Sequence, residues 1–281
     1  MPVIDAHTHI FPPEVRDHRD RYLARDATLR EMYADPKAKM ATVDDLLTAM
    51  DEDGVDVSVV MGPGWTDPGL ARESNDYIIE CVRKHPRRLV GFGGVNPAWG
   101  SKAADEAARC AKAGLRGIGE LHPDTQGFDV TDRAVMAPLM EAVQAHRLIV
   151  TVHTSEPAGH AYAGKGKTTP DRVLKLVTNF PDVPFILAHW GGGLPFYALM
   201  PEVGKALANT YVDTAASPFL YDARVFDAVA AAMGAERILL GSDYPLLRHS
   251  RLRAHLDASK LSATAKRAVL GGTAARLFGI A

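Results

Sequence analysis

This 281-residue chain contains histidine and carboxylate side chains whose spacing in the sequence would let them bind one cation together. The N-terminal sequence Ile4-Asp-Ala-His-Thr-His9 places His7 and His9 two residues apart. Residues two apart in a β-strand point to the same side, so Asp5, His7 and His9 are expected on one face. Two imidazoles on one face can bind a single metal ion.

Further polar candidates follow later apolar segments of the chain. Each lies at or just after the end of a predicted strand: Asn96, Glu120, His122, His153, His189, Asp213 and Asp243. A single histidine at such a position is more often a hydrogen-bonded loop residue than a ligand. As a set, imidazoles and carboxylates suit zinc or another divalent first-row ion that keeps an open position for water.

The elements that must position these residues alternate between strands and helices. Strands are predicted at about 3–9, 55–61, 89–95, 114–121, 148–153, 185–189, 211–214 and 238–241. Helices are predicted at 42–54, 71–85, 102–113, 132–146, 170–180, 196–208 and 223–233, with more near Leu252 and Ala263. No hairpin signal separates consecutive strands, which indicates a parallel sheet with right-handed crossovers.

Eight such units predict an α/β fold, a (β/α)8 TIM barrel that forms a single domain over residues 1–281. An insertion at about 11–41 follows the first strand, and extra helices close the C-terminus. The insertion is interpreted either as a lid or substrate loop, or as a solvated surface segment. A doubly wound open sheet is the alternative fold, but its glycine-rich phosphate fingerprint after the first strand is absent.

Composition favours small-molecule chemistry. The chain is 47% hydrophobic and 23% charged with a formal net charge of -2, which gives no electrostatic reason to expect nucleic acid or an anionic membrane as a partner. No apolar run approaches about 18 residues and no signal peptide is evident. Cys81 and Cys110 lack CxxC spacing and are expected to be free thiols, so we expect a cytoplasmic protein.

The ordered set of motifs resembles the amidohydrolase superfamily of metal-dependent barrels, in particular its aminocarboxymuconate-semialdehyde decarboxylase-like (amidohydrolase 2) branch. The motifs are Ile4-Asp-Ala-His-Thr-His9, Thr151-Val-His153, Leu187-Ala-His-Trp-Gly-Gly192, Gly241-Ser-Asp-Tyr-Pro245 and the closing 271–278. The resemblance implies that His7, His9 and His153 bind metal and that Asp243 is both a ligand and a proton acceptor. It implies that His189 binds a second metal or acts on the substrate.

Glu120 departs from one common pattern of the superfamily. Members with a bridged metal pair often carry a carbamylated lysine on strand four, and the sequence Gly117-Ile-Gly-Glu-Leu121 has none. Glu120 can replace that ligand, or it can accept a hydrogen bond from a ligand imidazole and orient it. One or two divalent ions are therefore both compatible with the sequence, with Zn²⁺ expected first and Mn²⁺ or Fe²⁺ as alternatives.

A hydrolase is the leading functional hypothesis. A bound ion would lower the pKa of water from about 15.7 to about 7 for attack on the C–O or C–N bond of a lactone, amide or ester. Asp243 would take the proton and His189 would stabilise the oxyanion or carry the proton. Glu120 favours hydrolysis, because decarboxylating members generally lack a carboxylate ligand on strand four. The alternatives are non-oxidative decarboxylation of an unsaturated or aromatic acid, and a non-catalytic metal- or ligand-binding barrel.

Residues expected to contact the substrate lie on loops that follow strands: Trp65, Asn96, His122, His160, Trp190 and Arg248. The glycine-rich segment at about 154–169 is expected to form a mobile lid, although its lysines can equally be solvated. Several cations near these loops favour a carboxylate-bearing substrate. A homodimer is expected from the resemblance and from its general frequency.

Overall fold

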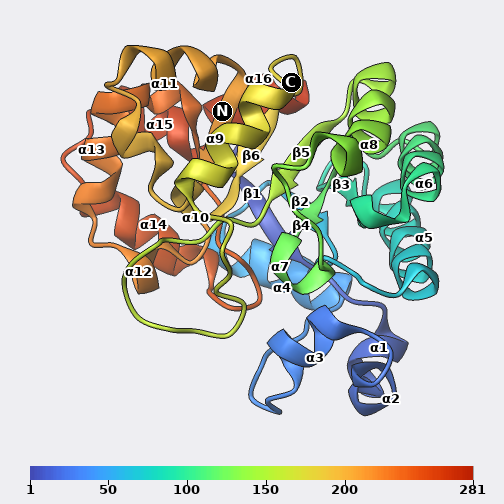
Figure 1. Cartoon of the computed structure of the whole chain (residues 1–281). Helices are drawn as coiled ribbons and strands as arrows, with labels where there is room; N and C mark the ends of the chain where they lie inside the picture. The colour runs from blue at the N-terminus through green and yellow to red at the C-terminus, as the bar shows by residue number, and fades with distance from the viewer. Residues whose placement is uncertain (281) are drawn as a thin grey trace.

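The computed structural model describes residues 1–280, in which eight parallel strands follow one another in sequence order around a barrel (Figure 1). They are β1 (Ile4–His9), β2 (Val57–Met61), β3 (Leu89–Gly93), β4 (Gly117–Leu121), β5 (Ile149–Val152), β6 (Phe185–Leu187), β7 (Thr210–Asp213) and β8 (Ile238–Leu239). The segment after β8 closes the ring onto β1, because Ala6 N donates to Leu240 O at 2.7 Å and His9 N to Tyr244 O at 2.7 Å. The predicted TIM barrel is confirmed.

Helices surround the barrel on its outer side (Figure 1). The longer ones are α4 (Val43–Asp53), α5 (Pro68–Lys84), α6 (Ser101–Lys112), α8 (Arg133–His146), α9 (Pro170–Asn179), α13 (Arg224–Met233) and α14 (His249–Asp257). The helix predicted at 196–208 is instead broken into a 3₁₀ turn at Leu194–Tyr197, α11 (Pro201–Ala206) and a second 3₁₀ turn. Pro201 accounts for the break, because proline starts a helix readily and interrupts one that is under way.

The insertion after β1 is packed onto the barrel. It contains α1 (Pro13–Asp17), α2 (Arg19–Leu23) and α3 (Ala27–Tyr33), and its apolar side chains Phe11, Leu29 and Tyr33 form a cluster with Trp65. Asp26 caps α3 and accepts hydrogen bonds from the backbone N of Thr66 at 2.6 Å and of Asp67 at 2.9 Å. The buried cluster and this carboxylate attach the insertion to the loop after β2.

Short helices connect the remaining elements. They are α7 (Pro123–Gln126), α10 (Ala188–Gly191), α12 (Ser217–Leu220), α15 (Ala263–Arg267) and α16 (Thr273–Phe278). Within the part of the chain described, no helix is both long enough and apolar enough to cross a membrane.

The C-terminal segment fixes the start of β1 at the amino end of the barrel. Phe278 of α16 packs edge-on against Phe92 with ring centroids 6.0 Å apart, in the same buried cluster as strand residues of the barrel such as Ile4 and Val59. Gly271 lies so close to β1 that a Cβ atom there would stand 2.0 Å from Pro2 O. The closing motif of the sequence therefore requires glycine at this position, and it helps to hold the strand that carries His7 and His9.

Candidate metal centre

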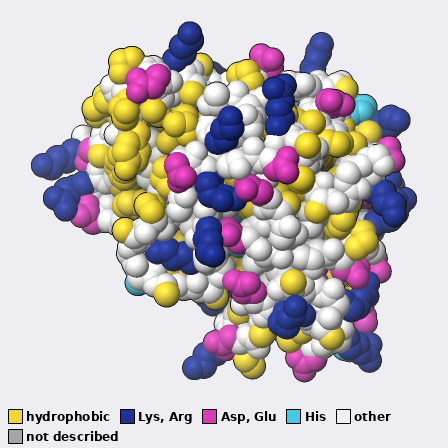
Figure 2. Space-filling model, viewed as in Figure 1, with side chains coloured by type: hydrophobic (Ala, Val, Ile, Leu, Met, Phe, Trp, Pro, Cys, Tyr) yellow, Lys and Arg dark blue, Asp and Glu magenta, His cyan; other side chains and the backbone are white. Residues whose placement is uncertain are grey.

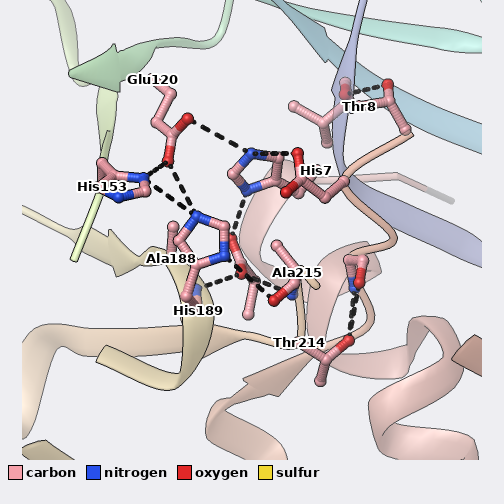
Figure 3. Close-up of polar contacts among 12 residues, drawn as sticks. His7, Thr8, Glu120, His153, Ala188, His189, Thr214 and Ala215 are labelled. Atoms are coloured by element: carbon pink, nitrogen blue, oxygen red, sulfur yellow. Dashed lines mark hydrogen bonds and ion pairs between the residues drawn. The ribbon is translucent and has the colours of Figure 1, made fainter. Parts of the chain in front are cut away.

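Six potential ligands from five different strand ends meet at the carboxyl end of the barrel, where active sites of this fold lie. They form two groups, in each of which the candidate ligand atoms all lie within 4.8 Å of one another. The first group is His7, His9 and Asp243, and the second group is Glu120, His153 and His189. Figure 3 shows His7, Glu120, His153 and His189 pointing toward one another.

The first group has the spacing of ligands around one ion. His7 Nε2 lies 3.1 Å from His9 Nε2, and Asp243 Oδ1 lies 3.3 Å from His9 Nε2 and 3.9 Å from His7 Nε2. Glu120 Oε2 from the second group is 3.7 Å from both of these nitrogens. Two ligand atoms about 2.1 Å from a shared ion stand roughly 3.0 Å apart at an angle of 90° and roughly 4.2 Å apart at 180°, so the observed distances of 3.1 to 3.9 Å are compatible with a divalent cation.

Asp213 at the end of β7 orients the first group. Its Oδ2 atom lies 2.8 Å from His7 Nδ1, and its Oδ1 atom accepts hydrogen bonds from the backbone N of His189 and of Ala215, both at 3.0 Å. A carboxylate on Nδ1 leaves Nε2 as the free, more basic ligand atom. Asp213 is a strand-end residue in the sequence, but the sequence alone assigned it no role, because its partner His7 lies 206 residues away.

Asp5 and the backbone place Asp243 beside β1. Asp5 Oδ1 accepts hydrogen bonds from the backbone N of His7 at 3.1 Å and of Ser242 at 3.0 Å, and Asp243 N donates to His7 O at 3.0 Å. Asp243 has a positive φ of 64°, a left-handed conformation that is uncommon for residues other than glycine. These bonds hold its backbone in that conformation at the edge of the site.

The second group is held by mutual contacts. Glu120 Oε1 lies 3.1 Å from His153 Nδ1 and 3.5 Å from His189 Nε2, and these two nitrogens are 3.1 Å apart. His189 Nδ1 lies 3.1 Å from Ala215 O. A carbonyl only accepts, so His189 Nδ1 carries a proton and Nε2 is the atom that can bind a metal or exchange a proton. The sequence predicted a strand as far as His189, but β6 ends at Leu187 and His189 has a left-handed φ of 56°.

The charges of the two groups compensate one another. Burial opposes charge on all four side chains concerned, but their neighbours outweigh it. The carboxylates of Asp213 and Glu120 hold the pKa of His7 well above its usual range, and Glu120 and Asp243 raise the pKa of His189 to about 9. In return, the imidazoles hold the pKa of Glu120 well below its usual range and lower that of Asp243 to about 2. The carboxylates thus require positive charge close by, which a divalent cation also supplies.

His122 supports His153 from one side. Its ring lies parallel to that of His153, with centroids 4.0 Å apart at 18°. Burial, with a contribution from His153, lowers the pKa of His122 to about 3, so the ring is neutral. Neither ring nitrogen has a hydrogen-bond partner among the described residues. The sequence predicted contact with the substrate, whereas the structure places His122 against the back of a candidate ligand.

A cavity of about 350 Å³ opens above the two groups. His9, Glu120, His153, His189 and Asp243 form its polar end. The insertion after β1 contributes Met32, Tyr33, Ala38 and Lys39, and the 154–169 segment contributes His160, Tyr162 and Ala163. Apolar side chains from α12 and from the loop after β8 complete the wall, chiefly Phe219, Leu220 and Leu246.

Of the predicted substrate residues, the structure brings His160 to this cavity and places the others elsewhere. Trp65 is buried against Phe11 in the cluster below the insertion, and Trp190 donates from Nε1 to Ser217 Oγ at 2.7 Å. Asn96 donates from Nδ2 to Gln126 O at 2.9 Å. The ring of Trp65 and the polar atoms of Trp190 and Asn96 therefore make their contacts in the protein interior, away from the cavity.

Arg248 does not reach the cavity either. Its guanidinium is paired with Asp53 Oδ2 at 3.0 Å and Glu52 Oε2 at 2.8 Å on α4. The two carboxylates draw the side chain to the outside of the barrel. Lys39 is the only lysine or arginine among the described residues that line the cavity.

Comparison with known proteins gives a consistent result. The amidohydrolase family model matches residues 4–280. The 2-amino-3-carboxymuconate-6-semialdehyde decarboxylase of Dictyostelium discoideum is 24% identical over 99% of this chain and 91% of its own length. The structure of 5-carboxyvanillate decarboxylase from Sphingomonas paucimobilis superposes with a TM-score of 0.79 at 20% identity, covering 100% of this chain and 99% of the other.

A second solved structure adds information about the ion. The dihydroxybenzoic acid decarboxylase of Polaromonas sp. JS666, solved with manganese and the inhibitor 2-nitroresorcinol, has a TM-score of 0.74 at 20% identity. The match covers 99% of this chain and 97% of that one.

These comparisons correct the functional expectation. The leading hypothesis of a hydrolase is wrong, because these three similar proteins are all decarboxylases. Glu120 was the residue that favoured hydrolysis, but its contacts do not select a reaction. Its carboxylate lies against four imidazoles, those of His7, His9, His153 and His189, and can balance their charge in either chemistry.

Proposed function

Because the chain belongs to the amidohydrolase family, we propose that it is a metal-dependent enzyme that removes carbon dioxide, without oxidation, from an aromatic or unsaturated carboxylic acid. One observation carries this proposal: an apolar cavity opens directly onto the cluster of imidazoles and carboxylates. The decarboxylases to which the chain is similar support the choice of reaction.

We propose that His7, His9 and Asp243 hold one divalent ion, with Glu120 and His153 beside it. Manganese is the ion we propose to test first, since a decarboxylase of similar fold was solved with it, and zinc is the comparison. When bound, the ion would hold an oxygen of the substrate and draw electron density from the adjoining bonds.

The cavity suits a flat acid, because a polar end adjoins an apolar wall. Its polar end would face the carboxylate or a neighbouring hydroxyl of the substrate, and Phe219, Leu220 and Leu246 would pack on the ring. Lys39 and His160 lie in the wall and can bind a second oxygen of an acidic substrate.

The proton for the reaction would come from His189. The bond from ring or alkene carbon to the carboxylate breaks, carbon dioxide leaves, and a proton takes its place on that carbon. His189 lines the cavity, and its Nδ1 donates to Ala215 O, so Nε2 is its exchangeable position. Asp243, also in the cavity wall, is placed to help return a proton to His189 from solvent.

The test is direct measurement of carbon dioxide. Protein loaded with Mn²⁺ or Zn²⁺ is incubated with 2,6-dihydroxybenzoate, 5-carboxyvanillate and unsaturated dicarboxylates in H₂¹⁸O. We expect carbon dioxide and the decarboxylated product in equal amounts, with no ¹⁸O in the product. His189→Ala should lose this activity, whereas the exposed Glu202→Gln on α11 should keep it. Turnover of a lactone or ester with ¹⁸O incorporation, and no release of carbon dioxide, would overturn the proposal.

A further inference from the structure

The insertion after β1 brings a tyrosine to the cavity above the two groups of candidate ligands. Tyr33 is the last residue of α3, and it lines this cavity together with Glu120, His189 and Asp243. The residue is only 8% exposed. It belongs to neither group of candidate ligands, so its side chain is available to contact a bound substrate.

The hydroxyl group of Tyr33 has no hydrogen-bond partner among residues 1–280. The cavity wall contains two hydroxyl groups, those of Tyr33 and Tyr162. Tyr162 Oη donates to Glu156 Oε2 at 3.1 Å, whereas Tyr33 is bonded only through its backbone O. Tyr33 Oη is not one of the fully enclosed polar atoms that lack a partner, so it reaches open space. It is therefore the hydroxyl of this wall that is free to donate to a ligand.

Two carboxylates lie near this hydroxyl. Burial raises the pKa of Tyr33 above its usual range, and the charges of Asp243 and Glu120 raise it further, against a smaller opposing effect of Arg19. Both carboxylates belong to the polar end of the cavity. The hydroxyl thus keeps its proton at neutral pH and offers a neutral donor at the end of the cavity where the reaction is proposed to occur.

The ring and the backbone of Tyr33 are both held in place. The ring packs edge-on against Phe11, with centroids 5.0 Å apart at 73°. Arg19 donates to the backbone O of Tyr33 at 3.3 Å and of Ala38 at 2.7 Å. Figure 2 shows Lys, Arg, Asp and Glu side chains on the outer surface, over the part of the view where α1, α2 and α3 lie in Figure 1. The aromatic side of the insertion faces inward, so little side-chain freedom is lost when Tyr33 contacts a ligand.

We propose that Tyr33 is a substrate-binding residue whose hydroxyl donates a hydrogen bond to the carboxylate of the bound acid. The nature of the ligand in this inference rests on the proposed function. A carboxylate at this end of the cavity lies near those of Glu120 and Asp243, so it needs hydrogen-bond donors in addition to a cation. Its negative charge is lost when carbon dioxide leaves, so the hydrogen bond stabilises the bound acid at least as much as the transition state. Tyr33 therefore affects KM rather than kcat.

Tyr33→Phe tests this role, because it removes the hydroxyl and keeps the ring against Phe11. Carbon dioxide release by the Mn²⁺-loaded protein is measured with 2,6-dihydroxybenzoate, 5-carboxyvanillate and unsaturated dicarboxylates. For the acid that reacts, we expect KM to rise about tenfold and kcat to stay within about twofold. Tyr22→Phe is the matched control. Tyr22 lies in the same cluster of the insertion and is 9% exposed, but it does not line the cavity, so its KM should not change.

Calorimetric titration separates this inference from the proposed function. The proteins carry His189→Ala to prevent turnover, and are titrated with each acid and with its decarboxylated counterpart, such as resorcinol for 2,6-dihydroxybenzoate. Tyr33→Phe should weaken binding of the acid by about tenfold and leave that of the counterpart unchanged. Metal content and the thermal unfolding midpoint should match those of the protein with Tyr33. An equal loss of affinity for both compounds would assign Tyr33 a structural role and overturn the inference.

The remaining outcomes are distinguishable. Unchanged KM and unchanged acid affinity in Tyr33→Phe, with carbon dioxide still released, would overturn the inference and leave the proposed function standing. Weaker acid binding in Tyr33→Phe, with no carbon dioxide released by the unmodified protein, would overturn the proposed function and support the role of Tyr33. A fall in kcat at unchanged KM, or binding of none of the acids to the unmodified protein, would overturn the inference.

Discussion

The two groups of candidate ligands differ in what holds them in place. In the first group, His7 is fixed from outside by Asp213 at 2.8 Å, and Asp243 is fixed by the backbone of His7 at 3.0 Å. In the second group, Glu120, His153 and His189 contact one another at 3.1 to 3.5 Å, and His189 is also fixed from outside, by Asp213 at its backbone N and by Ala215 O at its Nδ1. No outside carboxylate bonds to an imidazole of the second group, so its charge balance depends more on Glu120 than that of the first group does.

This difference suggests a division of labour. Ligands that are oriented by outside carboxylates keep their geometry without a metal, which favours strong metal binding. Imidazoles that share one carboxylate can gain or lose a proton and adjust. We infer that the first group holds the ion, with Asp243 also returning protons to His189, and that the second group balances charge and delivers the proton to the substrate. Substitutions in each group test this division of labour.

Asp243→Asn should cause the largest loss. The substitution removes the negative charge from the first group and also the group that exchanges protons with His189, so decarboxylation should fall by about 10³-fold. Metal content, measured by elemental analysis after dialysis, should fall in the same protein. Ser242→Ala, a change at the adjacent buried position, serves as the control for local disturbance. Retention of both metal and activity in Asp243→Asn would show that Asp243 is not needed to bind the ion.

Glu120→Gln should distinguish the role of the second group from that of the first. Because Glu120 balances the charge of His153 and His189, its loss should reduce kcat by about 10²-fold while the first group keeps its ion. Elemental analysis should give one ion per chain before and after the substitution. A fall from two ions to one would show instead that the second group is itself a metal site.

The sequence was sufficient to predict the barrel and the rim at which the candidate ligands meet, while their binding of metal stays a prediction. Strand period and βαβ order predicted the eight parallel strands, because these patterns are local. The six ligand candidates could be placed at one rim because parallel strands bring their carboxyl ends together. His7 and His9 needed only the period of two along one strand.

The sequence was not sufficient for the partners of these residues or for the walls of the cavity. The contact of Asp213 with His7 and the stacking of His122 on His153 depend on side-chain directions set by the closed barrel. Arg248 was expected in the cavity because its loop follows β8, but two carboxylates on α4 compete for it. Such competition between distant segments leaves no local signal in the sequence.

Asp213→Asn should have a smaller effect than either ligand substitution. The amide has one acceptor oxygen where the carboxylate has two, so it can serve either His7 Nδ1 or the backbone N of His189 and Ala215, and it carries no negative charge; metal affinity should therefore fall by about tenfold. Titration of the apoprotein with Mn²⁺ measures this directly. Activity at saturating Mn²⁺ should recover to near that of the unmodified protein, because Asp213 touches neither the ion nor the substrate in this assignment. Activity that stays low at saturating metal would mean that Asp213 also governs the proton on the second group.

Arg248→Gln should have the smallest effect, and it marks the outer limit of the site. Arg248 lies five residues after Asp243, yet its guanidinium binds Asp53 and Glu52. We expect unchanged KM and kcat, and a loss of stability of about 1 kcal/mol at pH 7. Burial opposes ionisation of Asp53, but the hydrogen bonds from Arg248 and Ser250 outweigh it and lower its pKa to about 2.

The pH dependence of that loss identifies its cause. Since the pKa of Asp53 is lower in the folded than in the unfolded state, its contribution is present above about pH 4 and disappears as the pH falls toward 2. The difference in unfolding free energy between the unmodified protein and Arg248→Gln, measured by urea titration, should therefore be constant from pH 7 to pH 5 and shrink below pH 4. A raised KM for an acidic substrate would instead indicate that Arg248 contacts the substrate. A loss of stability that does not change with pH would instead assign Arg248 a packing role. Glutamine is shorter than arginine as well as neutral, so the substitution removes side-chain volume together with the charge.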